Sequence, residues 1–358
     1  MKKIMFIGLE FNTFGKPTGL SRKINLPVTP SGQTMLLVEQ PCEYTPFKTD
    51  DEDITARISM IKDIITITSQ NNNVKEAISN GVQIVFMTPE FLFRGCTGAY
   101  TLDNYQKVVE GLTKVATDYK GWLFVFGSLL GKWEVDSTNG KSKTLIHNSV
   151  LVVTGGEGVD SNRIITKEFK SGIDFMGKMN QGNYGVFSSY VSDSGALTHY
   201  DVEHPSSGPT GTGKEEQKKP YDGNGIFTVN GITYGVEICL DHLEGRLTKS
   251  PVGKGSNLVQ VQLIPSAGAW IEDKAIVTCG NGLVFNCDSQ PASPSCTVKR
   301  VVKTYTPYTN QPATFDFDDC CYTNILLDKT SHQILQWGKA ARLKIYNPLD
   351  LPNSVTMN

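Results

Sequence analysis

The sequence lacks long hydrophobic runs, a strong charge of either sign and the paired cysteines of a metal site. No apolar stretch approaches the ~20 residues that a helix needs to span a bilayer, so we expect no membrane partner. The chain has 34 Lys and Arg against 36 Asp and Glu, which leaves a formal net charge of −2. This balance argues against nucleic acid and anionic membrane surfaces as partners.

The cysteines follow no metal-binding or redox spacing. Eight are present and none forms a C-x-x-C pair, which argues against zinc and thioredoxin-like centres. The even number admits disulfides. However, the apolar run Ile4–Leu9 is shorter than the ~7–15 residues of a secretory signal core, and Glu10 ends it. We interpret that run as a first buried strand, and we expect reduced thiols and a cytoplasmic location.

Hydrophobic periodicity predicts helices first and strands throughout. Apolar residues at helical spacing predict helices over 53–68, 74–79 and 102–119. Continuous apolar runs predict buried strands over 82–87 and 122–130. Strands alternate with helices early in the chain and hairpins follow later, including one around Asn230-Gly231 and a closing hairpin of 322–327 with 334–337.

This order predicts an α/β fold built as one domain over residues 1–358, with a mixed sheet and helices outside it. Two segments interrupt the pattern. Both are rich in Pro, Gly, Ser or Thr and cannot bury a core, so we predict loop insertions at 204–225 and 290–312.

Cys239 is the most informative residue for function. It stands in the run Tyr234-Gly-Val-Glu-Ile-Cys-Leu-Asp-His242, where an apolar strand ends at a cysteine. A thiolate at a strand end can meet a substrate without burying charge in the core. Taken alone, most such cysteines are small buried hydrophobic residues, so the hypothesis depends on the residues that accompany it.

Two further strand ends carry charged side chains. Glu90 follows a buried strand and is flanked by Phe86, Phe91 and Phe93, and a desolvated carboxylate is a better general base near neutrality. Lys167 ends another strand, where an ammonium group can stabilise an oxyanion. Lys170 competes with Lys167, because the two residues point to opposite faces of a strand.

With Glu, Lys and Cys in this order at three strand ends, the chain resembles the nitrilase (carbon–nitrogen hydrolase) superfamily over nearly its whole length. The segments that carry the resemblance are Thr88-Pro-Glu-Phe91, Phe126-Gly-Ser128, His147-Asn-Ser-Val-Leu-Val-Val153, Thr166-Lys-Glu-Phe169, Gly235-Val-Glu-Ile-Cys-Leu-Asp241, Ile264-Pro-Ser-Ala267 and Asn281-Gly-Leu-Val-Phe-Asn286. The glutamate and cysteine motifs are specific, and the lysine motif is looser.

The resemblance implies an α-β-β-α sandwich that forms homodimers or larger homo-oligomers. It implies a catalytic triad of Glu90 as the base, Lys167 as a charge stabiliser and Cys239 as the nucleophile, with the backbone N–H of Leu240 in the oxyanion hole. The expected activity is hydrolysis of a non-peptide C–N bond through a thioester, with a small amide as the expected substrate and a nitrile as the alternative. We expect no cofactor and no metal, because thiol, amine and carboxylate supply the chemistry.

The chain departs from the family pattern after Cys-x-Asp, where it has His242-Leu-Glu-Gly-Arg246. Many members also carry a second active-site glutamate. Asp174 is one candidate for this role, and Glu237 is another, as a supporting residue on the same strand side as Cys239. A paired structural carboxylate explains Glu237 equally well.

Three alternatives stay open on sequence alone. A papain-like protease needs a histidine to activate its thiol, and none of the five histidines lies in such a motif. A binding protein of the same fold without activity is a second alternative. An N-acyltransferase is the third, since it forms the same acyl-enzyme and differs only in what enters the pocket next.

Overall fold

The computed structural model describes residues 2–13, 47–95, 98–136, 142–167, 225–249, 259–289, 295–304, 311–316, 321–328, 331–332, 334 and 341–353. It also describes four short strands, which form two separate pairs: β7 (Met176–Lys178) with β8 (Tyr184–Val186), and β9 (Val202–His204) with β10 (Gly208–Thr210).

The first sheet is mixed and runs in the order β17-β18-β1-β2-β4-β5-β6. Strand β1 pairs in parallel with β2, and β2 with β4, whereas the outer neighbours are antiparallel. The strands of this sheet are β1 (Lys3–Glu10), β2 (Gln83–Met87), β4 (Trp122–Asp136), β5 (Ser142–Thr154), β6 (Arg163–Thr166), β17 (Tyr322–Leu326) and β18 (Arg342–Tyr346), with β3 (Tyr100–Thr101) and β19 (Leu349–Asp350) beside them.

The second sheet runs in the order β11-β12-β13-β14-β15-β16. Its central strands β12, β13 and β14 are parallel, so their carboxyl ends meet at one edge of the sheet. Its strands are β11 (Ile226–Val229), β12 (Ile232–Val236), β13 (Val259–Ser266), β14 (Thr278–Asp288), β15 (Ser295–Lys303) and β16 (Thr314–Asp316).

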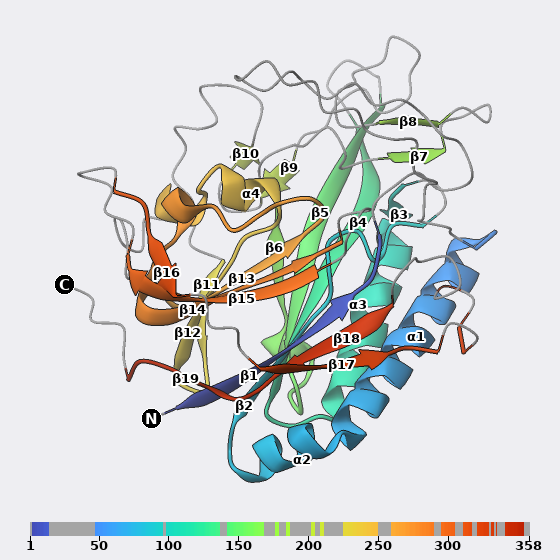
Figure 1. The fold of residues 1–358 in the computed structure, drawn as a ribbon. Coiled ribbons are helices and arrows are strands. Elements are labelled where there is room, and N and C mark those ends of the chain that lie inside the picture. The colour runs from blue at the N-terminus through green and yellow to red at the C-terminus, as the bar shows by residue number, and fades with distance from the viewer. Residues whose placement is uncertain are drawn as a thin grey trace, which may run out of the picture.

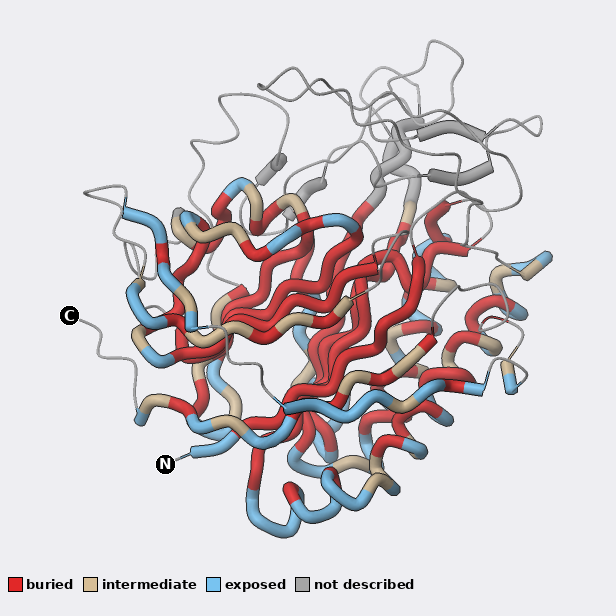
Figure 2. The backbone as a smooth tube through the Cα atoms, in the orientation of Figure 1, coloured by how far each residue is buried: buried red, intermediate tan, exposed pale blue. Residues whose placement is uncertain are grey.

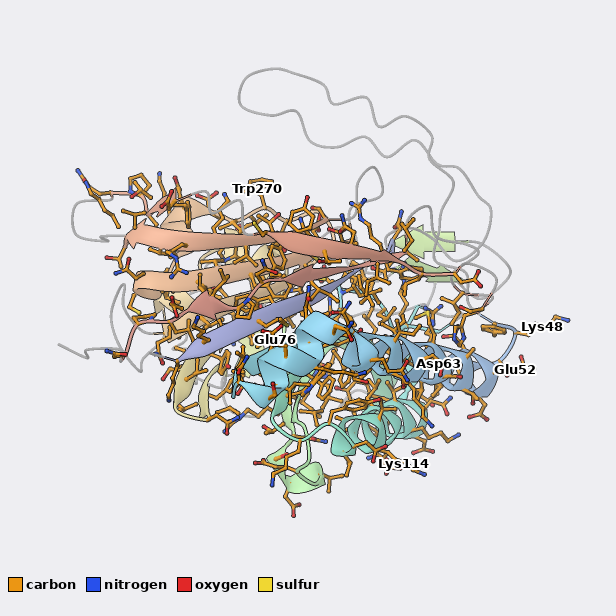
Figure 3. All side chains as sticks on the ribbon, turned by 60° about the horizontal axis from the view of Figure 1, so that its bottom comes forward. Lys48, Glu52, Asp63, Glu76, Lys114 and Trp270 are labelled. Carbon is orange, nitrogen blue, oxygen red and sulfur yellow. The ribbon has the colours of Figure 1, made fainter. Side chains whose placement is uncertain are left out.

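Helices α1 (Asp50–Gln70), α2 (Asn72–Ser79) and α3 (Leu102–Thr117) cover one face of the first sheet (Figure 1). The Thr49 hydroxyl caps α1 by accepting from Glu52 N, and four acidic residues in the first turn match the positive end of the helix dipole. In Figure 3 the charged side chains of Glu52, Asp63 and Lys114 lie on this helical side, whereas Trp270 lies on the opposite side of the molecule.

Alternation along the strands divides the core into two layers. In β1, Met5 and Ile7 pack with the helices, whereas Ile4 and Phe6 pack against the second sheet. Figure 2 shows the result as two adjacent buried sheets beside helices that are exposed only on their outer faces. The two sheets therefore hold their strand ends in a fixed relation to each other.

The outer face of the second sheet is covered by irregular segments and single-turn helices. These are α4 (Leu240–Leu243), η3 (Leu247–Lys249) and η4 (Asp273–Ala275), and a further turn, η1 (Val159–Ser161), precedes β6. The predicted class, an α/β sandwich of two sheets with helices outside, is confirmed. None of the helices in the described part of the chain has the length and apolar character needed to cross a bilayer.

One sequence prediction is wrong, and two fall largely outside the described residues. The predicted loop 290–312 contains strand β15, which pairs with β14 along six residues from Leu283 to Asp288. Strand β17 pairs with β18, and its predicted hairpin partner 334–337 lies outside the described residues except for residue 334. The predicted insertion 204–225 lies mostly outside the described residues, and the single-domain organisation stays a prediction.

Candidate active site

Three chain segments that leave strand ends form the candidate site. Glu90 follows β2, Lys167 follows β6 and Cys239 follows β12. The first two belong to the first sheet and Cys239 belongs to the second, so the site lies where the two sheets face each other. All three residues are buried, and Cys239 is 5% exposed.

Glu90 and Lys167 form an ion pair away from solvent. The Lys167 Nζ lies 2.9 Å from Glu90 Oε1, and both side chains are 0% exposed. Asn148 Nδ2 donates to the same carboxylate oxygen at 2.9 Å, and the Asn148 carbonyl accepts from Lys167 N at 2.7 Å. The ionic form of a buried pair persists only with such additional hydrogen bonds. Of the two lysines considered from sequence, Lys167 is the one placed beside Glu90, while Lys170 lies outside the described residues.

The backbone around Glu90 is held from several sides. Its N–H donates to Ser266 O at 3.4 Å, and the Thr13 hydroxyl donates to its carbonyl. The next residue, Phe91, has φ +66° and donates its N–H to the Ser128 hydroxyl at 2.9 Å. A positive φ is unfavourable for a bulky residue, so these contacts maintain a conformation that the chain would otherwise leave.

Cys239 occupies a sharp strand-to-helix turn. Its backbone has φ +48° and ψ −106°, an unfavourable conformation for a residue with a Cβ atom. Its N–H donates to Pro265 O at 3.1 Å, and its carbonyl accepts from His242 N at 3.0 Å. An elbow of this kind can place a side chain beyond the end of the sheet, as the strained strand-to-helix turn of α/β-hydrolases does for its serine.

The backbone amide of Leu240 differs from its neighbours in the turn. Asp241, His242 and Leu243 N–H each donate to a carbonyl of Ile238 or Cys239. For Leu240 N–H, no acceptor is found among the described residues. An N–H of this kind, next to the nucleophile, is the type of donor that an oxyanion hole requires.

The end of β13 joins the glutamate and cysteine segments. Pro265 O accepts from Cys239 N, and the adjacent Ser266 O accepts from Glu90 N. The Ser266 hydroxyl lies 2.8 Å from both Asn286 Oδ1 and Asp288 Oδ1 on the neighbouring β14. Two consecutive carbonyls of one central strand therefore position the backbones of both residues.

Glu237 forms its hydrogen bonds with residues other than Glu90 and Lys167. Its Oε1 accepts from Leu247 N at 2.6 Å, and its Oε2 lies 2.7 Å from both His242 Nδ1 and Gln262 Nε2. Two of these partners, Leu247 and His242, belong to the outer cover of the second sheet, and Gln262 lies on β13. The other candidate for a second acidic residue, Asp174, lies outside the described residues.

Aromatic and cationic residues surround the glutamate. The Arg94 guanidinium lies 5.1 Å from the Phe91 ring centroid and donates to Thr13 O, and the Lys167 Nζ lies 5.9 Å from the same centroid. Contacts of this kind are weakly attractive. Sequence reasoning assigned no role to Arg94 or to Asn148. Asn148 was detectable as a polar residue inside an apolar strand, whereas Arg94 had no such pattern.

The segment that departs from the family pattern also carries a buried cation. Arg246 Nε lies 3.8 Å from Asp241 Oδ2, and its backbone N–H donates to Asp241 O at 2.9 Å. Burial lowers the pKa of the Arg246 guanidinium below its usual range. The described residues contain no group of three or more His, Cys, Asp or Glu side chains arranged to hold a metal ion.

A hollow of about 1100 Å³ lies elsewhere, at the amino ends of the parallel strands. Its lining includes Lys2, Gln83, Trp122 and Asn230. Glu90 and Cys239 follow the carboxyl ends of their strands, so this hollow is separate from the candidate active site.

Comparison with known proteins gives matches among solved structures alone. No family model matches the chain, and a search of curated proteins finds no match. An amidase from Nesterenkonia sp. AN1 is 11% identical with a TM-score of 0.42, and the match covers 98% of this chain and 93% of that one. A mutant of that amidase, with acrylamide added at its active-site cysteine, is 10% identical with a TM-score of 0.42, and covers 98% and 94%.

A glutamine-dependent NAD(+) synthetase from Cytophaga hutchinsonii is 11% identical with a TM-score of 0.34, covering 87% of this chain and 40% of that one. The amidase structures include members of the nitrilase superfamily by their own description.

Proposed function

We propose that the chain is a hydrolase of the nitrilase superfamily that cleaves a non-peptide C–N bond, of the amidase type, through a thioester on Cys239. One observation carries the proposal. The backbones of Glu90 and Cys239 are bound to consecutive carbonyls at the end of β13, and the Glu90 carboxylate is paired at 2.9 Å with the buried Lys167 ammonium. Nucleophile, base and cation are the three parts that this chemistry needs.

In the first step, Glu90 accepts the thiol proton of Cys239 and the sulfur attacks the amide carbonyl carbon. A C–S bond forms, and the electron pair of the C=O double bond moves to oxygen. The Leu240 N–H and the Lys167 ammonium are the donors that stabilise this oxyanion. Donors fixed before the reaction stabilise a developing charge at little reorganisation cost.

In the second step, the oxyanion re-forms the carbonyl and the C–N bond breaks. Glu90 passes its proton to the leaving nitrogen, so ammonia or an amine departs and a thioester remains. Water then loses a proton to Glu90 and attacks the thioester carbon. The C–S bond breaks, the acid leaves, and the proton returns to sulfur, which restores the starting enzyme.

The proposal assigns Asn148 to holding Glu90, because its amide shares the oxygen that binds Lys167. A small-molecule amide is the proposed substrate. The homodimer or larger oligomer implied by the sequence resemblance stays a prediction.

The decisive experiment measures ammonia release from aliphatic amides, ω-amido acids, glutamine, carbamoyl amino acids and nitriles. Wild type is compared with Cys239→Ala, and Cys279→Ala is the matched control, since Cys279 is another buried cysteine in the same sheet. We expect release that requires Cys239 and not Cys279. The Cys239→Ala protein should remain folded, because a change of this size costs about 1–2 kcal/mol.

Undiminished turnover in Cys239→Ala would contradict the proposal. Where no panel compound releases ammonia, intact-mass analysis after incubation with each compound tests for an acyl adduct. An adduct on Cys239 that an added amine removes faster than water does would indicate acyl transfer in place of hydrolysis.

A further inference from the structure

A hydrogen bond joins the side chains of two residues that flank the turn at Cys239. Glu237 stands two residues before Cys239 and His242 three residues after it, and Glu237 Oε2 lies 2.7 Å from His242 Nδ1. Both side chains are buried, at 1% and 0% exposure. The bond therefore ties the incoming strand to the outgoing helix on either side of the strained residue.

The second ring nitrogen of His242 defines its protonation. His242 Nε2 lies 2.9 Å from the backbone N of Glu272, and that N–H is a donor, so Nε2 must be the acceptor. A neutral imidazole has one N–H, which we assign to Nδ1, where it donates to Glu237. His242 thus links the cysteine turn to the segment before η4 in one orientation only.

Glu237 is fixed by two more donors. Leu247 N–H donates to Oε1, and Gln262 Nε2 donates to Oε2. Gln262 is itself held on β13, because its Oε1 accepts from Val277 N at 3.1 Å and its Nε2 lies 3.0 Å from Ala275 O. Gln262 Oε1 also accepts from the Thr278 hydroxyl at 3.2 Å, so its amide is fixed between the Glu237 carboxylate and the segment that leads into β14.

We propose that Glu237 and His242, oriented by Gln262, are positioning residues that hold Cys239 in its reactive geometry; we name these three residues the elbow clamp. The proposal rests on Cys239 being the nucleophile. A strained backbone persists only where its surroundings over-determine it, and the elbow clamp supplies contacts on both sides of the turn. None of its members contacts Glu90 or Lys167 among the described hydrogen bonds, so it acts through Cys239.

The histidine offers two variants that separate its two contacts. In His242→Asn, the amide nitrogen can take the place of Nδ1 and keep the bond to Glu237. In His242→Gln, the amide oxygen can take the place of Nε2 and keep the bond to Glu272 N. Because the bond to Glu237 is the one that spans Cys239, His242→Asn should retain more activity than His242→Gln.

The experiment measures kcat and KM, the thermal midpoint, and the rate at which iodoacetamide alkylates Cys239, identified by peptide mass. The variants are Glu237→Gln, His242→Asn and His242→Gln. Glu272→Gln is the control, since it keeps the backbone N–H that donates a hydrogen bond to His242 Nε2. We expect kcat and the alkylation rate to fall roughly 10- to 100-fold in Glu237→Gln with KM within about 2-fold, as for small misplacements of reacting groups.

The outcomes distinguish this proposal from the proposed function. Alkylation reports on the sulfur even where no amide is turned over, so slower alkylation in Glu237→Gln and His242→Gln supports the elbow clamp in either case. Wild-type alkylation in folded Glu237→Gln, or faster alkylation through simple exposure of the sulfur, would overturn it. Where Glu237→Gln does not fold, equal rates in His242→Asn and His242→Gln would overturn it.

Discussion

At the scale of single residues, the buried ion pair of Glu90 and Lys167 bears on both stability and activity. Lys167 and Glu90 are both fully buried, and removing one member leaves an uncompensated charge. The cost of such a single truncation is about 3–5 kcal/mol, whereas replacing both members is far less destabilising. Stability and activity therefore depend on this pair for different reasons.

We expect Lys167→Met to lower kcat by roughly 10²–10³-fold, the effect of losing one oxyanion donor, and to destabilise the protein. The double variant Lys167→Met with Glu90→Gln should recover much of the stability and none of the activity. Urea midpoints and kcat of the single and double variants test this. Lys114→Met, at an exposed position of α3, is the control. A double variant no more stable than Lys167→Met would contradict the account.

The pairing of Glu90 with Lys167 could be predicted from the sequence only as a hypothesis. Each residue follows an apolar strand, and parallel or adjacent strand ends can meet. Their contact depends on the registers of β4 with β5 and of β5 with β6. The local sequence of a strand does not determine its register with a neighbouring strand. Asn148 was missed for the same reason, since its amide reaches Glu90 only through that alignment.

At the scale of secondary-structure elements, β4 approaches the Glu90 segment at Gly127. A Cβ atom there would lie 2.1 Å from the carbonyl oxygens of both Thr88 and Pro89. Gly127 N–H donates to the Thr88 hydroxyl at 2.7 Å, and the pairing of β4 with β5 shifts register between Phe126 and Leu129. The absence of a side chain thus lets the strand support the turn that carries Glu90.

Gly127→Ala should displace this turn, because neither backbone carbonyl can move independently. We expect destabilisation of about 1–3 kcal/mol, as for other overpacked sites, and a fall in kcat of at least 10-fold from misplacement of Glu90. Gly158→Ala is the control, since a Cβ atom there meets nothing within 4 Å. Thermal midpoints and steady-state rates check the result. Equal behaviour of the two variants would show that the turn does not depend on Gly127.

The elements with regular patterns were predictable, and those that depend on partners were not. Isoleucines at helical spacing predicted a helix over 53–68, and α1 spans Asp50–Gln70. Strand β15 was mistaken for a loop, because Pro and Ser residues precede it and only alternate positions are buried against β14. Glu237 was a candidate for support of the active site, with a paired structural carboxylate as the alternative, and its partner Gln262 lies on β13, which sequence spacing cannot reveal.

At the scale of the whole molecule, buried thiols and phenols link stability to alkaline pH. Burial raises the pKa of the Cys279 thiol to about 11 and that of the Tyr105 hydroxyl to about 12. In the unfolded chain a thiol ionises with a pKa of about 8.5. The native state therefore holds these protons to higher pH. The stability that Cys279 contributes is present below about pH 8.5 and is lost as pH rises towards 11, and that of Tyr105 is lost between about pH 10 and 12.

We expect the urea midpoint, measured with a reductant present, to fall between about pH 8 and pH 10.5. Cys279→Ala should show a smaller fall than wild type, because it removes one group whose pKa differs between the folded and unfolded states. For each protein, the urea midpoint at the higher pH is subtracted from the midpoint at the lower pH. This difference cancels the direct effect of the substitution on stability. Identical falls in both proteins would exclude Cys279 as a contributor.

The end of β13 has a consequence for motion. The amides of Glu90 and Cys239 are bound to the carbonyls of Ser266 and Pro265, which lie in two adjacent peptide units joined at the Ser266 Cα atom. Because Glu90 follows a strand of the first sheet and β13 belongs to the second, the bond between Glu90 N and Ser266 O links the two sheets at this point. A displacement of the end of β13 therefore acts on the backbones of the glutamate and of the cysteine at the same time.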